Sequence, residues 1–125
     1  MVIGIGLDIV EIERVESALR RHGERFVRRI MDDEEARGLP ADPATKALAM
    51  ALAVAGKEAA SKALGTGWSN GVAWRQVVVS PGPPAAITLG GRAAEVARAL
   101  GSTGRVRARV YRDGAMAVAE ALLLS

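Results

Sequence analysis

The sequence contains no cysteine, a single histidine and few aromatic residues. Without cysteine the chain has no disulfides, no thiolate metal site and no thiol nucleophile, and nothing in it indicates an oxidising compartment. One Phe, one Tyr and two Trp provide few rings on which nucleic-acid bases stack. The shortage of rings and the absence of a base-reading motif argue against a nucleic-acid partner.

The opening of the sequence does not have the pattern expected of a signal peptide or a membrane span. This apolar opening, MVIGIGLDIV, has no basic leader and is interrupted by Asp8. We therefore expect a cytoplasmic protein with no membrane partner. Half of the 125 residues are hydrophobic, which is enough for a core without cross-links. With no internal repeat or linker, residues 1–125 are predicted to form one α+β domain.

Positive charge is concentrated in one segment. The net charge is +3, but Arg14–Arg29 carries six arginines against two glutamates, a local balance of +4. The rest of the chain is therefore close to −1. This distribution favours an acidic partner, which could be an acidic protein, a phosphate-rich ligand or nucleic acid.

The first half of the chain is predicted to be mainly helical after an initial strand. Apolar spacing and glycine stops give a strand at Val2–Ile9, helices at Glu11–His22, Glu24–Met31 and Ala44–Leu64, and a loop around Gly38, Pro40 and Pro43. The last helix is the longest and is rich in Ala, Leu, Met and Lys. An acidic run, Asp32–Glu35, precedes the loop.

The second half is predicted to consist of hairpins around a short helix. The expected elements are strands at Trp74–Ser80 and Ala85–Leu89, a helix at Arg92–Leu100, and strands at Arg105–Tyr111 and Ala115–Leu124. The alanines and leucines of the last segment also suit a helix. The Asp113-Gly114 turn favours a strand that returns along Arg105–Tyr111.

Asp8 is the first candidate for chemistry, because it lies in an apolar strand directly before a helix. Burial of a carboxylate is costly without a partner. Its carboxylate could cap the following helix or bind a metal ion. The residues alone leave both interpretations open.

A second candidate is the segment Gly56–Gly67. Glu58 and Lys62 are four residues apart, so in a helix they share one face. Alone, they favour a surface ion pair over a catalytic role, since such pairs are common and contribute little to stability. Thr66 lies between two glycines, in a loop whose backbone amides could approach a phosphate.

Two motifs resemble the signatures of the holo-acyl-carrier-protein synthases, which are phosphopantetheinyl transferases. Ile3–Arg14 is similar to the opening of these enzymes, and Lys57–Gly67 is similar to their second signature, in the same order and at the expected separation. A weaker resemblance continues through Gly82, Pro84, Leu89–Ala93 and Gly101. The resemblance implies a mainly antiparallel sheet with a long helix, and a homotrimer that binds coenzyme A between subunits.

The resemblance also implies an activity and a set of site residues. The reaction is transfer of phosphopantetheine from coenzyme A to a serine of an acyl carrier protein. Asp8 and Glu58 would bind Mg²⁺, Lys62 would stabilise the phosphate, and Glu58 or a water would accept the serine proton. The implied coenzyme A contacts are Lys57, Lys62, Gly65, Thr66, Gly67 and Arg112. The carrier contacts are Arg14 and Arg21.

The sequence departs from the family pattern at three places on the expected coenzyme A side. Ala53 replaces an arginine, Arg109–Arg112 replaces a Ser-Leu-Ser-His run, and Gly82-Pro83-Pro84 replaces a Gly-Lys/Arg-Pro turn. A second hypothesis is therefore a diverged member that binds a carrier protein, or acts on a carrier-bound substrate, without phosphopantetheinyl transfer. A third is a basic nucleic-acid-binding domain.

Overall fold

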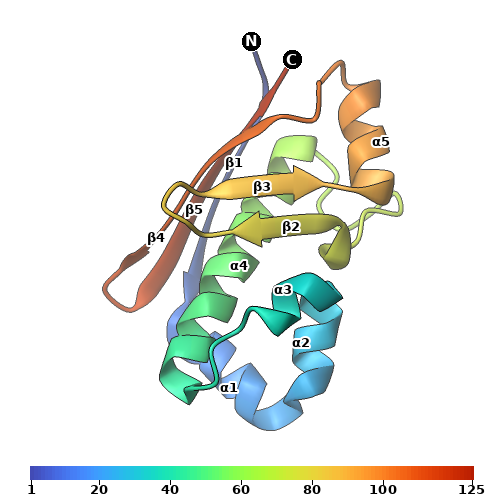
Figure 1. Cartoon of the computed structure of the whole chain (residues 1–125). Coiled ribbons are helices and arrows are strands. Elements are labelled where there is room, and N and C mark those ends of the chain that lie inside the picture. The colour runs from blue at the N-terminus through green and yellow to red at the C-terminus, as the bar shows by residue number, and fades with distance from the viewer.

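An antiparallel sheet is wrapped around one long helix in the computed structural model, which describes residues 1–125 (Figure 1). The helices are α1 (Ile12–His22), α2 (Glu24–Ile30), α3 (Asp33–Arg37), α4 (Pro43–Leu64), α5 (Gly91–Ala99) and the short 3-10 helix η1 (Trp74–Gln76). The strands are β1 (Val2–Glu11), β2 (Val77–Ser80), β3 (Ala86–Leu89), β4 (Val106–Asp113) and β5 (Met116–Leu124). None of the helices combines the length and hydrophobicity needed to cross a membrane.

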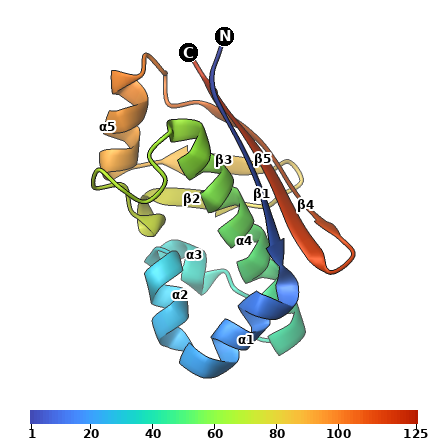
Figure 2. The same cartoon turned by 180° about the vertical axis from the view of Figure 1, so that it is seen from behind.

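The sheet has the strand order β1-β5-β4-β3-β2, and every neighbouring pair is antiparallel. β3 and β4 pair at a single position, Ile87 with Val106, so the sheet has two parts. β1, β5 and β4 form a long three-stranded part, and β2 and β3 form a short hairpin beside it (Figure 1). Val2 pairs with Leu124, which places the two termini side by side (Figure 2).

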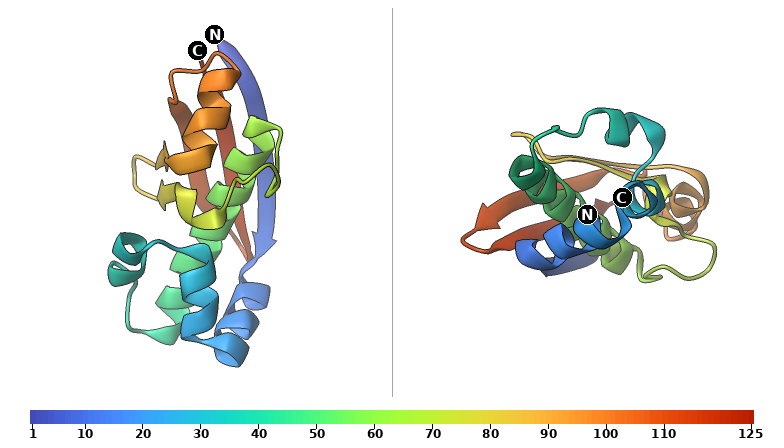
Figure 3. Two further views of the ribbon diagram at one scale, coloured as in Figure 1. Left: turned by 90° about the vertical axis from the view of Figure 1, so that its right-hand side faces the viewer. Right: turned by 90° about the horizontal axis from the view of Figure 1, so that it is seen from below.

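Helix α4 is the centre of the core. It lies between β1 on one side and the β2–β3 hairpin on the other (Figure 3). Twelve of its 22 residues are buried, and most of them are alanines. Because alanine is the best helix former and has a small side chain, the helix stays regular while strands approach it from several directions.

Two glycines bring β1 into backbone contact with α4. A Cβ atom added to Gly6 would lie 1.7 Å from the Ala59 carbonyl oxygen, and one added to Gly4 would lie 1.9 Å from the Ala63 carbonyl oxygen. No other residue type fits at either position while the spacing is kept. The glycines of the first motif therefore set the distance between the strand that carries Asp8 and the helix that carries Glu58.

The predicted α+β class, the antiparallel sheet and the long helix are confirmed. The last segment is the strand β5, as the Asp113-Gly114 turn indicated. The acidic run was not recognised as a helix, yet it forms α3. Asp32 caps this helix by accepting from the Glu35 amide, and the Glu35 side chain accepts from the Asp32 amide.

Glu35 also forms a buried ion pair with Lys57. Their Nζ and Oε1 atoms are 2.9 Å apart, and the two side chains are 0% and 4% exposed. The Lys57 ammonium also donates to the carbonyl oxygens of Trp74 and Val77, and Glu35 Oε2 accepts from the Val79 amide. Burial lowers the pKa of Lys57, and the hydrogen bond and charge of Glu35 partly offset this effect. The pair therefore joins α3, α4 and β2.

The contact between β1 and α4 predicts that alanine substitutions at two glycines differ in their effect on stability. Gly6→Ala should destabilise the fold by at least about 3 kcal/mol in urea unfolding, because the methyl group would overlap backbone atoms of α4. Gly38→Ala is the matched control, since its Cβ would meet only ordinary contacts at a φ of −82°. Equal stability of the two variants would contradict the close approach.

The buried ion pair predicts a second effect on stability. Lys57→Met should lower the free energy of unfolding by about 3 kcal/mol, because the buried Glu35 carboxylate would lose its counter-charge. Adding Glu35→Gln should restore part of the loss, since the unpaired charge is then removed. Urea titration of both variants measures the difference in the free energy of unfolding. If Lys57→Met alone were as stable as wild type, the prediction would be contradicted.

Candidate active site

Asp8 and Lys62 form an ion pair between β1 and α4. Lys62 Nζ is 2.9 Å from Asp8 Oδ1 and donates to the Leu7 carbonyl oxygen at 3.0 Å. The Asp8 side chain is 16% exposed and the Lys62 side chain 51%, so the pair lies at the surface and is accessible to a ligand. Asp8 does not cap α1, because the N-cap position is Glu11. The capping interpretation of Asp8 was therefore wrong.

Glu58 lies one helical turn before Lys62 but does not pair with it. Instead, Glu58 Oε1 accepts a hydrogen bond from Trp68 Nε1 at 3.2 Å. Trp68 in turn stacks on Trp74, with ring centroids 4.0 Å apart and an angle of 22° between the planes. The interpretation of Glu58 and Lys62 as a simple ion pair was also wrong, because Lys62 is held by Asp8.

Asp8 and Glu58 are linked to one another through Lys62, which pairs with Asp8 and follows Glu58 by one helical turn. Glu58 and Lys62 share a face of α4, and Lys62 reaches Asp8 across the glycine contact. Asp8 Oδ2 and Glu58 Oε2 have no hydrogen-bond partner within the chain. These free oxygens are hard ligands of the kind that Mg²⁺ prefers, and such ions are commonly bound by one or two carboxylates, with water and phosphate oxygens as further ligands. The donor set fits this ion.

The loop after α4 is folded back onto the helix. Gly65 caps α4 in the left-handed conformation, with φ at 79°. The amides of Gly65 and Gly67 donate to the carbonyl oxygens of Lys62 and Ser61. These two amides close the helix and already have carbonyl acceptors within the chain. The Thr66 hydroxyl donates to the Gly67 carbonyl oxygen.

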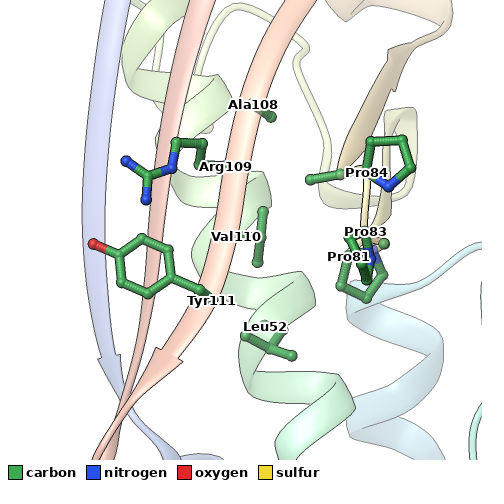
Figure 4. A pocket seen from close by; sticks show the side chains of 10 residues that line it. Leu52, Pro81, Pro83, Pro84, Ala108, Arg109, Val110 and Tyr111 are labelled. Carbon is green, nitrogen blue, oxygen red and sulfur yellow. The ribbon is translucent and has the colours of Figure 1, made fainter.

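A cavity of about 520 Å³ lies between β4 and the β2–β3 turn (Figure 4). It is lined by Leu52, Pro81, Gly82, Pro83, Pro84, Ala85, Ala108, Arg109, Val110 and Tyr111. Two of the three departures from the family pattern, the proline-rich turn and the Arg109–Arg112 segment, thus meet at one place. Ala53, the third, is buried in α4 next to the lining residue Leu52.

None of the six predicted coenzyme A contacts, Lys57, Lys62, Gly65, Thr66, Gly67 and Arg112, lines this cavity. Lys57 is 0% exposed and its ammonium is held by Glu35 and two carbonyl oxygens, so it has no free donor position for a ligand at the surface. Arg112 does not line the cavity, and its Nε donates to the Gly114 carbonyl oxygen in the β4–β5 turn.

Most arginines of the basic segment are free to meet a partner. Arg20 pairs with Glu16, whereas Arg14, Arg21, Arg25, Arg28 and Arg29 have no carboxylate within 4.0 Å. Arg14 and Arg21 are both exposed and lie seven residues apart on α1, so they share one face. This arrangement suits an acidic surface.

Sequence reasoning missed Trp68 and Glu35. The acidic run was visible in the sequence, but nothing in it indicated that Glu35 turns inward toward Lys57. Trp68 comes directly after the second motif, and only the folded loop places it beside Glu58. The presence of just two tryptophans, six residues apart, was the available signal for a shared role.

Comparison with known proteins identifies the family of the chain. Residues 4–118 match the family model described as the 4'-phosphopantetheinyl transferase superfamily. A holo-acyl-carrier-protein synthase of Solidesulfovibrio magneticus is 43% identical over 122 residues, which cover 94% of this chain and 96% of the relative. A protein of the same name from Vibrio cholerae is 48% identical over 103 residues, which cover 80% of each chain.

Solved structures show the same fold. The crystal structure of the holo-acyl-carrier-protein synthase from Neisseria meningitidis has a TM-score of 0.82 and 25% identity, with both chains fully covered. The Helicobacter pylori synthase, solved in complex with coenzyme A, has a TM-score of 0.76 and 26% identity over 95% of this chain and 98% of that one. The chain therefore belongs to the holo-acyl-carrier-protein synthases of the 4'-phosphopantetheinyl transferase superfamily.

Proposed function

We propose that this chain transfers phosphopantetheine from coenzyme A to a serine hydroxyl of an acyl carrier protein. The observation that carries the proposal is 43% identity, over nearly the whole chain, to a protein named for this activity. The group of Asp8, Glu58 and Lys62 provides the charges that such a reaction requires. The family match does not favour a carrier-binding protein without transfer activity, or a nucleic-acid-binding domain.

Asp8 and Glu58 are the residues that would bind Mg²⁺, each through its unpartnered oxygen. The bound ion would neutralise charge on the pyrophosphate of coenzyme A and help to align it. Lys62 pairs with Asp8 and shares a helical face with Glu58, and it would stabilise the negative charge that builds on the transferred phosphate.

In the transfer step, the serine oxygen forms a bond to the phosphorus that carries pantetheine. The bond between that phosphorus and the bridging oxygen breaks, and adenosine 3',5'-bisphosphate leaves with the bond electrons. Glu58 accepts the serine proton directly or through a water molecule. Lys62 is oriented by Asp8 and would direct its charge toward the leaving phosphate.

The cavity beside β4 is our candidate for the nucleotide end of coenzyme A. It gathers the turn and strand segments that the family pattern places on the coenzyme A side. The Arg109 side chain lies over the Tyr111 ring, 5.2 Å from its centroid, and both point to the side of β4 away from Leu52 and the prolines, so the lining of the cavity is largely apolar (Figure 4). We propose that Gly65, Thr66 and Gly67 lie near the phosphates through their loop, and that Lys57 acts in the fold instead of in binding.

Arg14 and Arg21 are our proposed contacts for the acyl carrier protein. Both are exposed on α1 without an internal counter-charge. A carrier surface rich in carboxylates would be steered to this helix, and its serine would then approach Asp8 at the end of the adjoining strand β1.

We also propose that the chain forms a homotrimer and works in the cytoplasm as a single domain over residues 1–125. No helix covers the side of β1, β5 and β4 that faces away from α4 (Figure 2). This outer face exposes Ile5 by 69%, Leu7 by 53% and Ile9 by 59%, and Tyr111 lies on the same side by its register. Contacts between copies would remove this apolar patch from water.

The transfer proposal predicts loss of activity when either acid is removed. Asp8→Ala and Glu58→Ala should each lower the rate of carrier modification at least about 100-fold, because transition-state stabilisation by the cation is lost. The assay is incubation with an apo carrier protein, coenzyme A and Mg²⁺, followed by mass spectrometry of the carrier. Asp33→Ala is the matched control, since its side chain is 81% exposed and outside the site.

Unchanged turnover in either site variant would remove the proposed metal role of that residue. If wild-type protein at high concentration binds the carrier but leaves no covalent adduct, the proposal of transfer fails and the diverged-member hypothesis gains. Binding to oligonucleotides alone, weakened by salt, would instead favour the nucleic-acid hypothesis.

The trimer proposal predicts that one charge on the outer face separates the subunits. Wild-type protein should have three times the 13.0 kDa mass of one chain in light scattering, and Leu7→Asp should shift it toward the monomer. Leu100→Asp is the control, because Leu100 is 46% exposed at the end of α5, away from this face. A monomeric wild-type protein would contradict the proposal.

A further inference from the structure

The Glu58 carboxylate is held by one side chain. Trp68 Nε1 donates to Glu58 Oε1 at 3.2 Å, and the nearest lysine on the same helical face, Lys62, donates elsewhere. We infer that Trp68 is a positioning residue that orients Glu58 toward a divalent cation. The inference rests on the metal role proposed for Glu58.

The chemistry of the indole group suits this role. An indole N–H is a neutral donor and accepts no hydrogen bond, so it fixes the carboxylate without cancelling its charge. A lysine in the same place would compete with a cation for the carboxylate. Because Trp68 occupies Oε1, the unpartnered Oε2 is the oxygen available as a ligand. Outer hydrogen bonds of this kind orient ligands and strengthen metal binding.

Trp68 is itself held in place by Trp74. The two rings stack with centroids 4.0 Å apart. Trp74 belongs to η1, and its carbonyl oxygen accepts from Lys57 Nζ at 3.1 Å. Consecutive residues of α4, Lys57 and Glu58, are thus linked through the two tryptophans, and rotation of Glu58 away from Trp68 would break this closed set of contacts.

The loop between Glu58 and Trp68 requires its glycines. Gly65 and Gly67 both have positive φ, at 79° and 55°. The Gly67 amide donates to the Ser61 carbonyl oxygen at 3.2 Å, which turns the chain back along α4. This reversal places Trp68 beside Glu58. Gly65 and Gly67 therefore have a structural role in addition to the proposed phosphate contact.

The test removes the N–H and keeps the ring. Trp68→Phe should weaken the binding of Mn²⁺, used as the probe with saturating coenzyme A, by about tenfold in calorimetry. Trp74→Phe is the matched control. It retains a ring for stacking and leaves the Trp68 N–H in place, so Mn²⁺ affinity should stay within about twofold of wild type.

A spectroscopic readout tests the geometry without measuring turnover. In Trp74→Phe the only tryptophan left is Trp68, because the chain has two. Paramagnetic Mn²⁺ bound to Glu58 should quench its emission in a saturable manner, and Glu58→Gln should abolish the saturable part. Quenching by Mn²⁺ that rises without saturation would place the ion elsewhere and overturn the inference.

The variants separate failure of the inference from failure of the metal site. Wild-type Mn²⁺ affinity in Trp68→Phe, with weakened binding in Glu58→Gln, would overturn the positioning role of Trp68 alone. Wild-type affinity in both variants would overturn the metal role of Glu58 as well. Equal losses in Trp68→Phe and Trp74→Phe would assign the effect to ring packing and also overturn the role of the N–H.

Discussion

The backbone contact between β1 and α4 is the constraint on which the site depends. Gly4 and Gly6 let the strand lie directly against the carbonyl oxygens of the helix, where a single methyl group would collide. Asp8 follows Gly6 by two residues, so its side chain is on the same face of the strand. Lys62 can then reach it across the contact. The glycines of the first motif therefore act through packing, and the acid that follows them supplies the charge.

The neighbouring residues Lys57 and Glu58 divide two tasks on one helix. Lys57 is buried and joins α4 to α3 and β2 through Glu35 and two carbonyl oxygens. Glu58 lies on the side of Lys62 and Asp8, with one oxygen held by Trp68. Lys57 fixes the rotation of α4 about its own axis. It therefore also fixes the direction in which the Glu58 side chain points. The residue that stabilises the core therefore also orients the residue to which we assign the chemistry.

Much of the fold and part of the site could be predicted from the sequence. Apolar periodicity located the long helix within one residue at its start, and Asp113-Gly114 identified the last hairpin. Patterns among residues close in the sequence did not predict side-chain positions that depend on contacts between residues far apart in the sequence. The inward turn of Glu35, the pairing of Lys62 with Asp8 instead of Glu58, and the position of Trp68 all depend on partners at least ten residues away. Helical spacing alone favoured Glu58 for Lys62, and the strand across the glycine contact offered a better placed carboxylate.

The departures from the family pattern gather at our proposed nucleotide side of the site. The proline-rich turn and the Arg109–Arg112 segment meet at the cavity beside β4, whereas Asp8, Glu58 and Lys62 lie in the two motifs that resemble the family. The central claim is that Asp8 and Glu58 share one divalent ion. Anomalous diffraction from crystals grown with Mn²⁺ and coenzyme A tests it most directly. The account predicts one peak bonded to an oxygen of each carboxylate, and a peak bonded to neither, with the two carboxylates too far apart for one ion, would contradict it.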